Sequence, residues 1–187
     1  MIKRLVLLSI LPFVLSACSS VDTQVDFNKE VDFSKLKTYS WLPDSKKRYT
    51  DIRLNSDIFK KRIYNTVNKA LAARGYKEVT HNPDFTLGYH VVIENKTSVN
   101  TMNDYYGYPR SGWGRNYYSQ YNLHSTQTSV YHYEEGSLIL DIVDTKSKQL
   151  IWRGSAQAEI SKSRTAKQRD ELVQKAVDKL FSQLPAK

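Results

Sequence analysis

The alternation of apolar and polar positions predicts β-strands in the middle of the chain. Within residues 84–94 (DFTLGYHVVIE), every second side chain from Phe85 to Ile93 is apolar. A period of two is typical of a strand that buries one face. Residues 129–144 and 149–160 predict two further strands, joined by a turn at 144–148. We expect a bulge or bend at Gly136, because glycine inside a strand often marks one.

The last two strands should pair as a hairpin. Their expected core face carries Leu138, Leu140, Ile142, Leu150, Trp152, Ala156, Ala158 and Ile160. One register that keeps these residues on the same face sets Asp141 opposite Arg153 on the polar face. We therefore predict a cross-strand pair between these two residues.

Two segments follow the helical period. Phe59, Ile63, Val67 and Leu71 form one apolar stripe. Asn55 or Ser56 is placed to cap the amino end of this helix, and Gly75 to end it. A second helix is predicted over 167–183, with a ridge of Leu172, Ala176, Leu180 and Leu184.

One more strand is predicted near the front, in FSKLKTYSWL, where Phe33, Tyr39 and Trp41 share one side. The order of elements predicts an α+β domain over residues 32–187. We expect a four-stranded, mostly antiparallel sheet with two helices packed on one face. A long aromatic-rich loop insertion, residues 97–128, should join strands two and three.

The amino-terminal segment has the pattern of a lipoprotein signal. Lys3 and Arg4 precede an apolar run that is too short to span a bilayer, and LSAC ends in Cys18, the single cysteine of the chain. We predict a signal peptide over 1–17, cleavage before Cys18 and acylation of that cysteine. Residues 18–31 are expected to form the acylated cysteine and a tether. Ser19 and Ser20 favour the outer membrane over retention at the inner membrane.

Three segments are the most specific of the chain: TYSW at 38–41, EGSLILDIVD at 135–144 and LIWRGSA at 150–156. They resemble one family of bacterial lipoproteins, called domain of unknown function 4136, and the resemblance covers residues 25–185. The family has no established activity, so the resemblance implies fold and location and transfers no catalytic residue.

The chain is basic, with a formal net charge of +9. An exported protein rarely meets nucleic acid, so we expect no nucleic-acid partner. Anionic lipid head groups, lipopolysaccharide or acidic glycans are more plausible partners for this charge. The Lys and Arg residues are scattered, however, which is typical of a solvated surface.

Candidate catalytic and metal chemistry is sparse. The best metal constellation is His132 and Glu134, joined by His90 if their strands pair, and we favour ordinary polar residues of a sheet over a zinc site. The sequence has no GxSxG elbow and no phosphate-binding glycine motif. We therefore predict no enzymatic activity, no cofactor and no metal.

The loop over 97–128 offers the one candidate binding surface. Its candidate binding residues are Tyr105, Tyr106, Tyr108, Arg110, Trp113, Arg115, Tyr117, Tyr118 and Tyr121. Tyrosine with arginine is common in binding surfaces, and loops of this length are often functional. An envelope protein, peptidoglycan or lipopolysaccharide would fit. Two alternatives stay open: a mobile insertion without a ligand, and tyrosines packed over one end of the sheet.

The sequence thus predicts an outer-membrane lipoprotein that faces the periplasm and binds or scaffolds other envelope components. One alternative is a structural envelope protein with a dispensable loop. A periplasmic hydrolase or metal-binding protein built around His90 and His132 is a second alternative.

Overall fold

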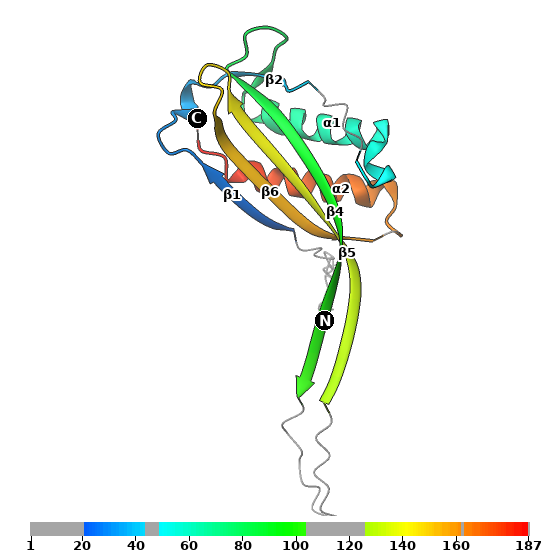
Figure 1. The fold of residues 1–187 in the computed structure, drawn as a ribbon. Coiled ribbons are helices and arrows are strands. Elements are labelled where there is room, and N and C mark those ends of the chain that lie inside the picture. The colour runs from blue at the N-terminus through cyan, green and yellow to red at the C-terminus, as the bar shows by residue number, and fades with distance from the viewer. Residues whose placement is uncertain (1–20, 44–48, 104–125, 162, 187) are drawn as a thin grey trace, which may run out of the picture.

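A single sheet with two helices on one face forms the body of the protein (Figure 1). The computed structural model describes residues 21–43, 49–103, 126–161 and 163–186. In these residues the sheet has six strands in the order β1-β6-β5-β4-β2-β3. The strands are β1 (Asp22–Phe27), β2 (Thr38–Trp41), β3 (Lys77–Glu78), β4 (Phe85–Asn103), β5 (Thr126–Asp144) and β6 (Leu150–Ile160). The helices are α1 (Asp57–Ala73) and α2 (Ala166–Ser182), with short 3-10 turns η1 (Phe33–Lys35) and η2 (Ile52–Asn55).

The prediction of a four-stranded, mostly antiparallel sheet is wrong, because the sheet is six-stranded and mixed. β1 lies inside the segment expected to be a tether, and β3 follows α1 after three residues. β2 runs parallel to both β3 and β4. The two extra strands are edge strands with little apolar alternation, so their conformation comes from pairing with a neighbour and not from their own sequence.

Both predicted helices are confirmed, including their ends. The Ser56 side chain accepts a hydrogen bond from the Ile58 N–H, so Ser56 caps α1. Gly75 has a φ of 80°, the left-handed conformation that ends a helix. At the start of α2, Thr165 and Gln168 form a reciprocal capping box. The helices pack against each other and against the sheet through the predicted apolar stripes.

The predicted pairing of Asp141 with Arg153 is confirmed. The two residues are directly opposite, and the Arg153 Nε and Nη2 groups donate to the Asp141 carboxylate at 2.6 and 2.7 Å. The irregularity of this hairpin does not lie at Gly136, as expected, but between Ile142 and Val143. There Val143 pairs with Leu150, so Ile151 is the extra residue of a bulge.

This bulge changes which side chain is buried. Ile151 is 2% exposed, whereas Leu150, predicted to face the core, is 44% exposed. Gly136 instead leaves room for a neighbour, since a Cβ there would lie 3.1 Å from the Ile160 side chain.

β4 and β5 extend far beyond the rest of the sheet. Their pairing continues to Asn103 and Thr126, whereas the pairing of β5 with β6 ends at Glu134 and Ile160. Residues 95–103 and 126–133 therefore form a two-stranded arm that projects about 25–30 Å from the body (Figure 1). The loop expected over 97–128 is thus partly strand. The polar residues of this segment show no apolar alternation, because no helix in the described residues covers either face of the arm.

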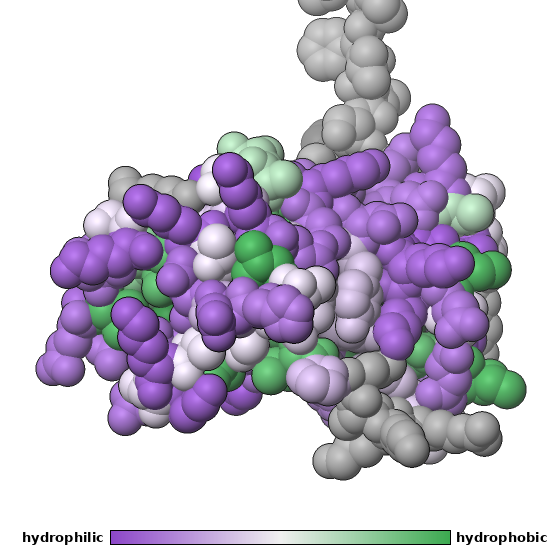
Figure 2. All heavy atoms as spheres, turned by 90° about the horizontal axis from the view of Figure 1, so that it is seen from above, coloured by the Kyte–Doolittle hydropathy of each residue, from purple (hydrophilic) through white to green (hydrophobic). Residues whose placement is uncertain are grey.

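The core lies between the sheet and the two helices. Its largest fully buried side chains include Trp152, Tyr39, Phe85 and Phe181. Burial raises the pKa of Tyr39 to about 12, and its hydroxyl donates to Asn68 Oδ1 at 3.0 Å. Seen from above, at the end opposite the arm, the surface is mostly hydrophilic with small separate apolar patches (Figure 2).

Candidate functional site

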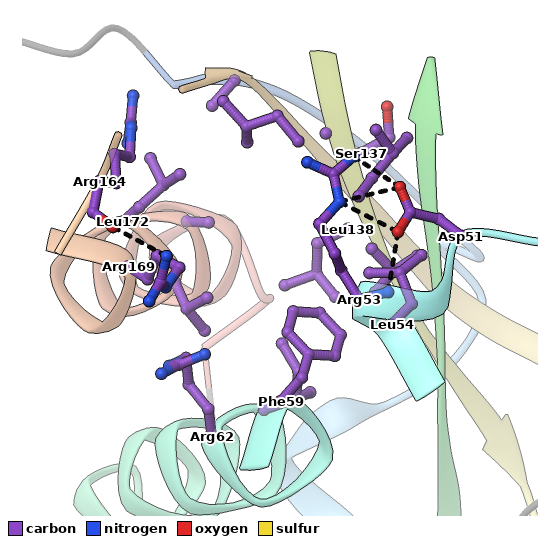
Figure 3. A pocket seen from close by; sticks show the side chains of 18 of the residues that line it. Asp51, Arg53, Leu54, Phe59, Arg62, Ser137, Leu138, Arg164, Arg169 and Leu172 are labelled. Carbon is purple, nitrogen blue, oxygen red and sulfur yellow. Dashed lines mark hydrogen bonds and ion pairs between the residues drawn. The ribbon is translucent and has the colours of Figure 1, made fainter. Parts of the chain in front are cut away.

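A cavity of about 750 Å³ opens between the sheet and the amino-terminal ends of both helices (Figure 3). Its walls are mainly apolar. They are formed by Val21, Leu54, Phe59, Ile63, Val91, Ile93, Leu138, Ala156, Ala158, Ile160, Leu172, Val173 and Ala176, with Ile52 and Ile58 also in the lining. A volume of this size is typical of sites that bind small organic molecules.

Small residues on the sheet explain why this end of the core is hollow. Gly136, Ala156 and Ala158 line the cavity from β5 and β6, and Ala176 lines it from α2. At the other end of the same layer, Trp152 and Phe181 fill the space, with ring centroids 5.9 Å apart. Because protein interiors are normally close-packed, a gap of this volume makes the cavity a candidate ligand site.

Apolar side chains are also exposed beside the cavity. Ile52 of η2 is 82% exposed and Ile58 of α1 is 71% exposed. An exposed apolar surface next to an apolar cavity favours a ligand that continues from the cavity to the outside, or an apolar surface that meets the protein there.

Among the described residues, four arginines line the cavity: Arg53, Arg62, Arg164 and Arg169. Arg53 donates to both carboxylates of the lining, Asp51 and Glu134, at distances from 2.5 to 3.3 Å. These hydrogen bonds, first those to Asp51, raise the pKa of Arg53 above its usual range. Arg62 pairs with Asp170.

The other two arginines have a different environment. Arg164 Nη2 donates to the Glu159 carbonyl, and Arg169 Nη1 donates to the Arg164 carbonyl, each at 2.8 Å. Within the described part of the chain, neither arginine has a carboxylate partner. Figure 3 shows them on the α2 side of the cavity, across from the Arg53–Asp51 pair.

The described residues of the lining are mainly apolar or cationic, and they include neither histidine nor cysteine. The two carboxylates among these described residues, Asp51 and Glu134, accept hydrogen bonds from Arg53.

A second, smaller hollow of about 500 Å³ lies beside β4. Trp41 and Tyr64 stack there with ring centroids 4.1 Å apart, and Trp41 Nε1 donates to Asn68 at 2.9 Å. Because these rings pack on one another, the hollow presents less uncommitted surface than the helix–sheet cavity does.

The histidine site proposed from the sequence is not formed. His90 pairs with Ile139 across the sheet, whereas His132 pairs with Thr97 and its Nδ1 lies 3.0 Å from Thr97 Oγ1. Thr97 lies seven positions beyond His90 along β4, so the two histidines are about 24 Å apart along the sheet. Glu134 binds Arg53 instead. Among the described residues, no group of three or more potential metal ligands comes together.

The other predicted site residues lie outside the described residues. These are Cys18 and the aromatic and arginine residues from Tyr105 to Tyr121. The strands that flank the second group end at Asn103 and Thr126, at the far end of the arm.

The cavity itself was missed by sequence reasoning. Ile52 and Arg53, which contribute to the lining, lie in a mainly polar stretch between β2 and α1 that has no apolar period. A usable signal was the run of small residues at alternate positions of β6 (Gly154, Ala156, Ala158), which face helices rather than solvent.

The family resemblance is tested by a match over nearly the whole chain. The family model described as "Domain of unknown function (DUF4136)" matches residues 23–186. The chain belongs to this family. A comparison with curated proteins finds no match.

Solved structures share the fold of this DUF4136 chain at low identity. A PDZ domain protein from Parabacteroides distasonis matches 90% of the chain at 12% identity with a TM-score of 0.56, and the chain spans 36% of that protein. The PelC dodecamer from Paraburkholderia phytofirmans is similar over 90% of this chain and 99% of its own, at 9% identity and a TM-score of 0.49. At such identities the similarity to the first structure shows the fold alone.

Proposed function

We propose that this protein is a lipid-anchored, non-enzymatic binding module of the bacterial cell envelope, and that the helix–sheet cavity is its ligand site. The observation that carries the proposal is the cavity itself, which is large, apolar and open. A ligand with an apolar part would bury surface there that would otherwise remain in contact with water.

The anchor in this proposal is Cys18, acylated after removal of residues 1–17. LSAC supports the anchor, and Ser19-Ser20 favours the outer membrane, with the domain in the periplasm. The membrane would then be a partner through the acyl chains. In the described residues, no helix has the length and apolarity needed to span a bilayer.

The fold supports a short distance between anchor and cavity. Val21 is 1% exposed and lines the cavity. Its carbonyl accepts a hydrogen bond from Lys179 Nζ at 2.7 Å, and Thr23 Oγ1 accepts one from Gln183 at 2.9 Å. Cys18 precedes Val21 by three residues, which span at most about 11 Å when fully extended. An acylated Cys18 would therefore hold the cavity end of the domain close to the bilayer.

A neutral fluorescent probe tests the cavity as a binding site. We would express the chain from residue 18 with Cys18→Ser, so that no lipid is attached, and titrate it with N-phenyl-1-naphthylamine. The expected result is saturable binding with enhanced fluorescence, because the probe is apolar and small enough for the cavity.

Two variants locate the binding. Ala158→Phe would place a ring in the cavity and should abolish the saturable signal. Gln157→Phe puts the same ring on the exposed side of the same strand and should leave binding unchanged. Equal binding by both variants, or no binding by the parent chain, would reject the cavity as the ligand site.

A second candidate surface is the arm. Val99 and Val130 are directly opposite each other yet 59% and 56% exposed, and in the described residues the arm strands pair only with one another. Open strand edges and exposed apolar pairs favour a protein partner. In this second proposal the arm carries the tyrosine-rich segment to an envelope protein, peptidoglycan or lipopolysaccharide, without a role for nucleic acid.

A further inference from the structure

The charge at the cavity is unevenly distributed, and this asymmetry indicates which ligand the cavity takes. On the η2 side, Arg53 is neutralised by Asp51 and Glu134. On the α2 side, Arg164 and Arg169 carry two positive charges with no carboxylate partner among the described residues. A group that complements the α2 side must be an anion.

The arginine geometry favours an oxyanion. Each guanidinium uses one N–H group on a backbone carbonyl, which fixes the planar group beside the cavity. Its remaining N–H groups have no protein partner in the described part of the chain. Guanidinium groups of this kind suit phosphate and carboxylate oxygens, with which they form paired hydrogen bonds.

Arg62 lies on the facing helix and adds to this side of the cavity. It is bound to Asp170, whose side chain is 61% exposed, whereas that of Arg62 is 13% exposed. The carboxylate of Asp170 balances Arg62, so the uncompensated charge belongs to Arg164 and Arg169.

The apolar walls and the membrane distance complete the argument. The apolar walls favour a long apolar group, and the two arginines favour an anion. The proposed anchor, Cys18, lies at most about 11 Å from Val21, which lines the cavity. We infer that the cavity takes an acyl chain of an anionic membrane phospholipid, with the phosphate bound by Arg164 and Arg169. This inference rests on the proposed function, because it assumes that the cavity is a ligand site beside a membrane.

Lipid exchange from vesicles tests the inference. The unlipidated chain with Cys18→Ser is incubated with vesicles of equal amounts of phosphatidylcholine and phosphatidylglycerol, separated from them without a change of salt concentration, and extracted for mass spectrometry. We expect phosphatidylglycerol to be enriched over phosphatidylcholine by about tenfold or more, because hydrogen bonds between charged groups are strong enough to produce a difference in affinity of this size. Ala158→Phe should carry neither lipid.

Arginine variants identify the residues that bind the phosphate. Arg164→Gln with Arg169→Gln should lose the preference for phosphatidylglycerol but still bind the neutral probe. A charge-matched control, Lys29→Gln with Arg74→Gln, removes two exposed cations that do not line the cavity and should keep the preference. The double variant Arg164→Lys with Arg169→Lys preserves both charges and should retain part of the preference for phosphatidylglycerol.

One measurement needs no arginine variant, in case the glutamine variant does not fold. Raising the salt concentration from about 0.05 M to about 0.5 M during exchange should lower the preference for phosphatidylglycerol, because screening weakens charge pairs. Binding of the neutral probe should not fall.

The outcomes separate the two proposals. Equal uptake of both phospholipids, or uptake of palmitate but of neither phospholipid, would overturn the inference while leaving the cavity a ligand site. Failure of the parent chain to bind the neutral probe would overturn the proposed function itself.

Discussion

Asp84 joins β2 to β4, and its replacement by alanine should loosen this edge of the sheet. Its Oδ2 accepts hydrogen bonds from the N–H groups of Lys37 and Thr38 and from the Thr38 hydroxyl, each at 2.9 Å. The Asp84 N–H donates back to Thr38 O and Oγ1 at 3.0 and 3.1 Å. Only three residues of β2 pair with β4, so this one carboxylate makes a large share of the contacts between the two strands.

The expected loss follows from the bonds that would be broken. A hydrogen bond to a charged group contributes about 1.5–3 kcal/mol, and removal of the acceptor leaves two N–H groups without their partner. Since the site is only half-buried, water would form hydrogen bonds with some of the freed N–H groups. We therefore expect Asp84→Ala to lower the free energy of unfolding by about 2–3 kcal/mol. Asp84→Asn keeps an acceptor but loses the charge, so its loss should be about 1 kcal/mol.

The effect should depend on pH. The hydrogen bonds, first that from the Lys37 N–H, hold the pKa of Asp84 below its ordinary value. A lowered folded-state pKa means that the stabilisation is complete above the unfolded pKa of about 3.9 and is lost as pH falls through the folded value. The difference between the parent protein and Asp84→Ala should therefore be full at neutral pH and shrink as the pH falls below about 4.

Urea unfolding followed by tryptophan fluorescence measures this difference at each pH. Asp26→Ala is the control: Asp26 is an exposed aspartate on edge strand β1, and its replacement should change stability by less than about 0.5 kcal/mol. Equal midpoints for the parent protein and Asp84→Ala at neutral pH, or a difference that stays constant into the acid range, would refute the role given to Asp84.

Three further predictions concern the core, the arm and the anchor. A Cβ at Gly154 would lie 2.5 Å from Trp152 and 3.0 Å from Leu180, so Gly154→Ala should destabilise the protein by about 1–3 kcal/mol in the same urea assay; an unchanged midpoint would contradict this packing. Replacement of residues 104–125 by Asn-Gly should leave the melting temperature nearly unchanged, because Asn103 and Thr126 are already paired for a tight turn. In the complete chain, a photoreactive residue in place of Tyr106 or Tyr118 should crosslink to a partner, and the replacement of 104–125 removes these positions and should abolish the contact. No crosslink from either position in the complete chain would argue against the arm as a binding surface. Cys18→Ser should abolish incorporation of labelled palmitate and release the protein from membranes, and retained label would exclude Cys18 as the lipid site.

The helices and the central strands were predictable because their signals are local. A helix or a half-buried strand repeats its apolar side chains at a fixed period, so Ile63, Val67 and Leu71, or Phe85 and Leu87, reveal the buried face without any tertiary information. The pairing of Asp141 with Arg153 was predictable for a related reason. The core faces of β5 and β6 must coincide, and that condition limits the possible registers.

The errors arose where neighbours, and not the sequence itself, decide the conformation. The sequence of β1, DTQVDF, has too little apolar alternation to predict a strand. The segment is extended because it pairs with the free edge of β6 and contacts α2. The side chains of residues 95–100 and 128–133 are largely polar, yet they continue β4 and β5 because the ladder between the two strands satisfies their backbone groups.

The sequence by itself determined the helices, the central hairpin, the family and the predicted lipid signal, because each depends on a pattern of residues that are close together in the chain. Only the tertiary structure decided the parallel β2, the arm and the cavity. The cavity forms where small residues of β5 and β6 face Phe59 of α1 and Leu172 of α2, and where arginines far apart in the chain meet at one opening. Such volume and charge exist only between elements, so no single segment of the sequence contains them.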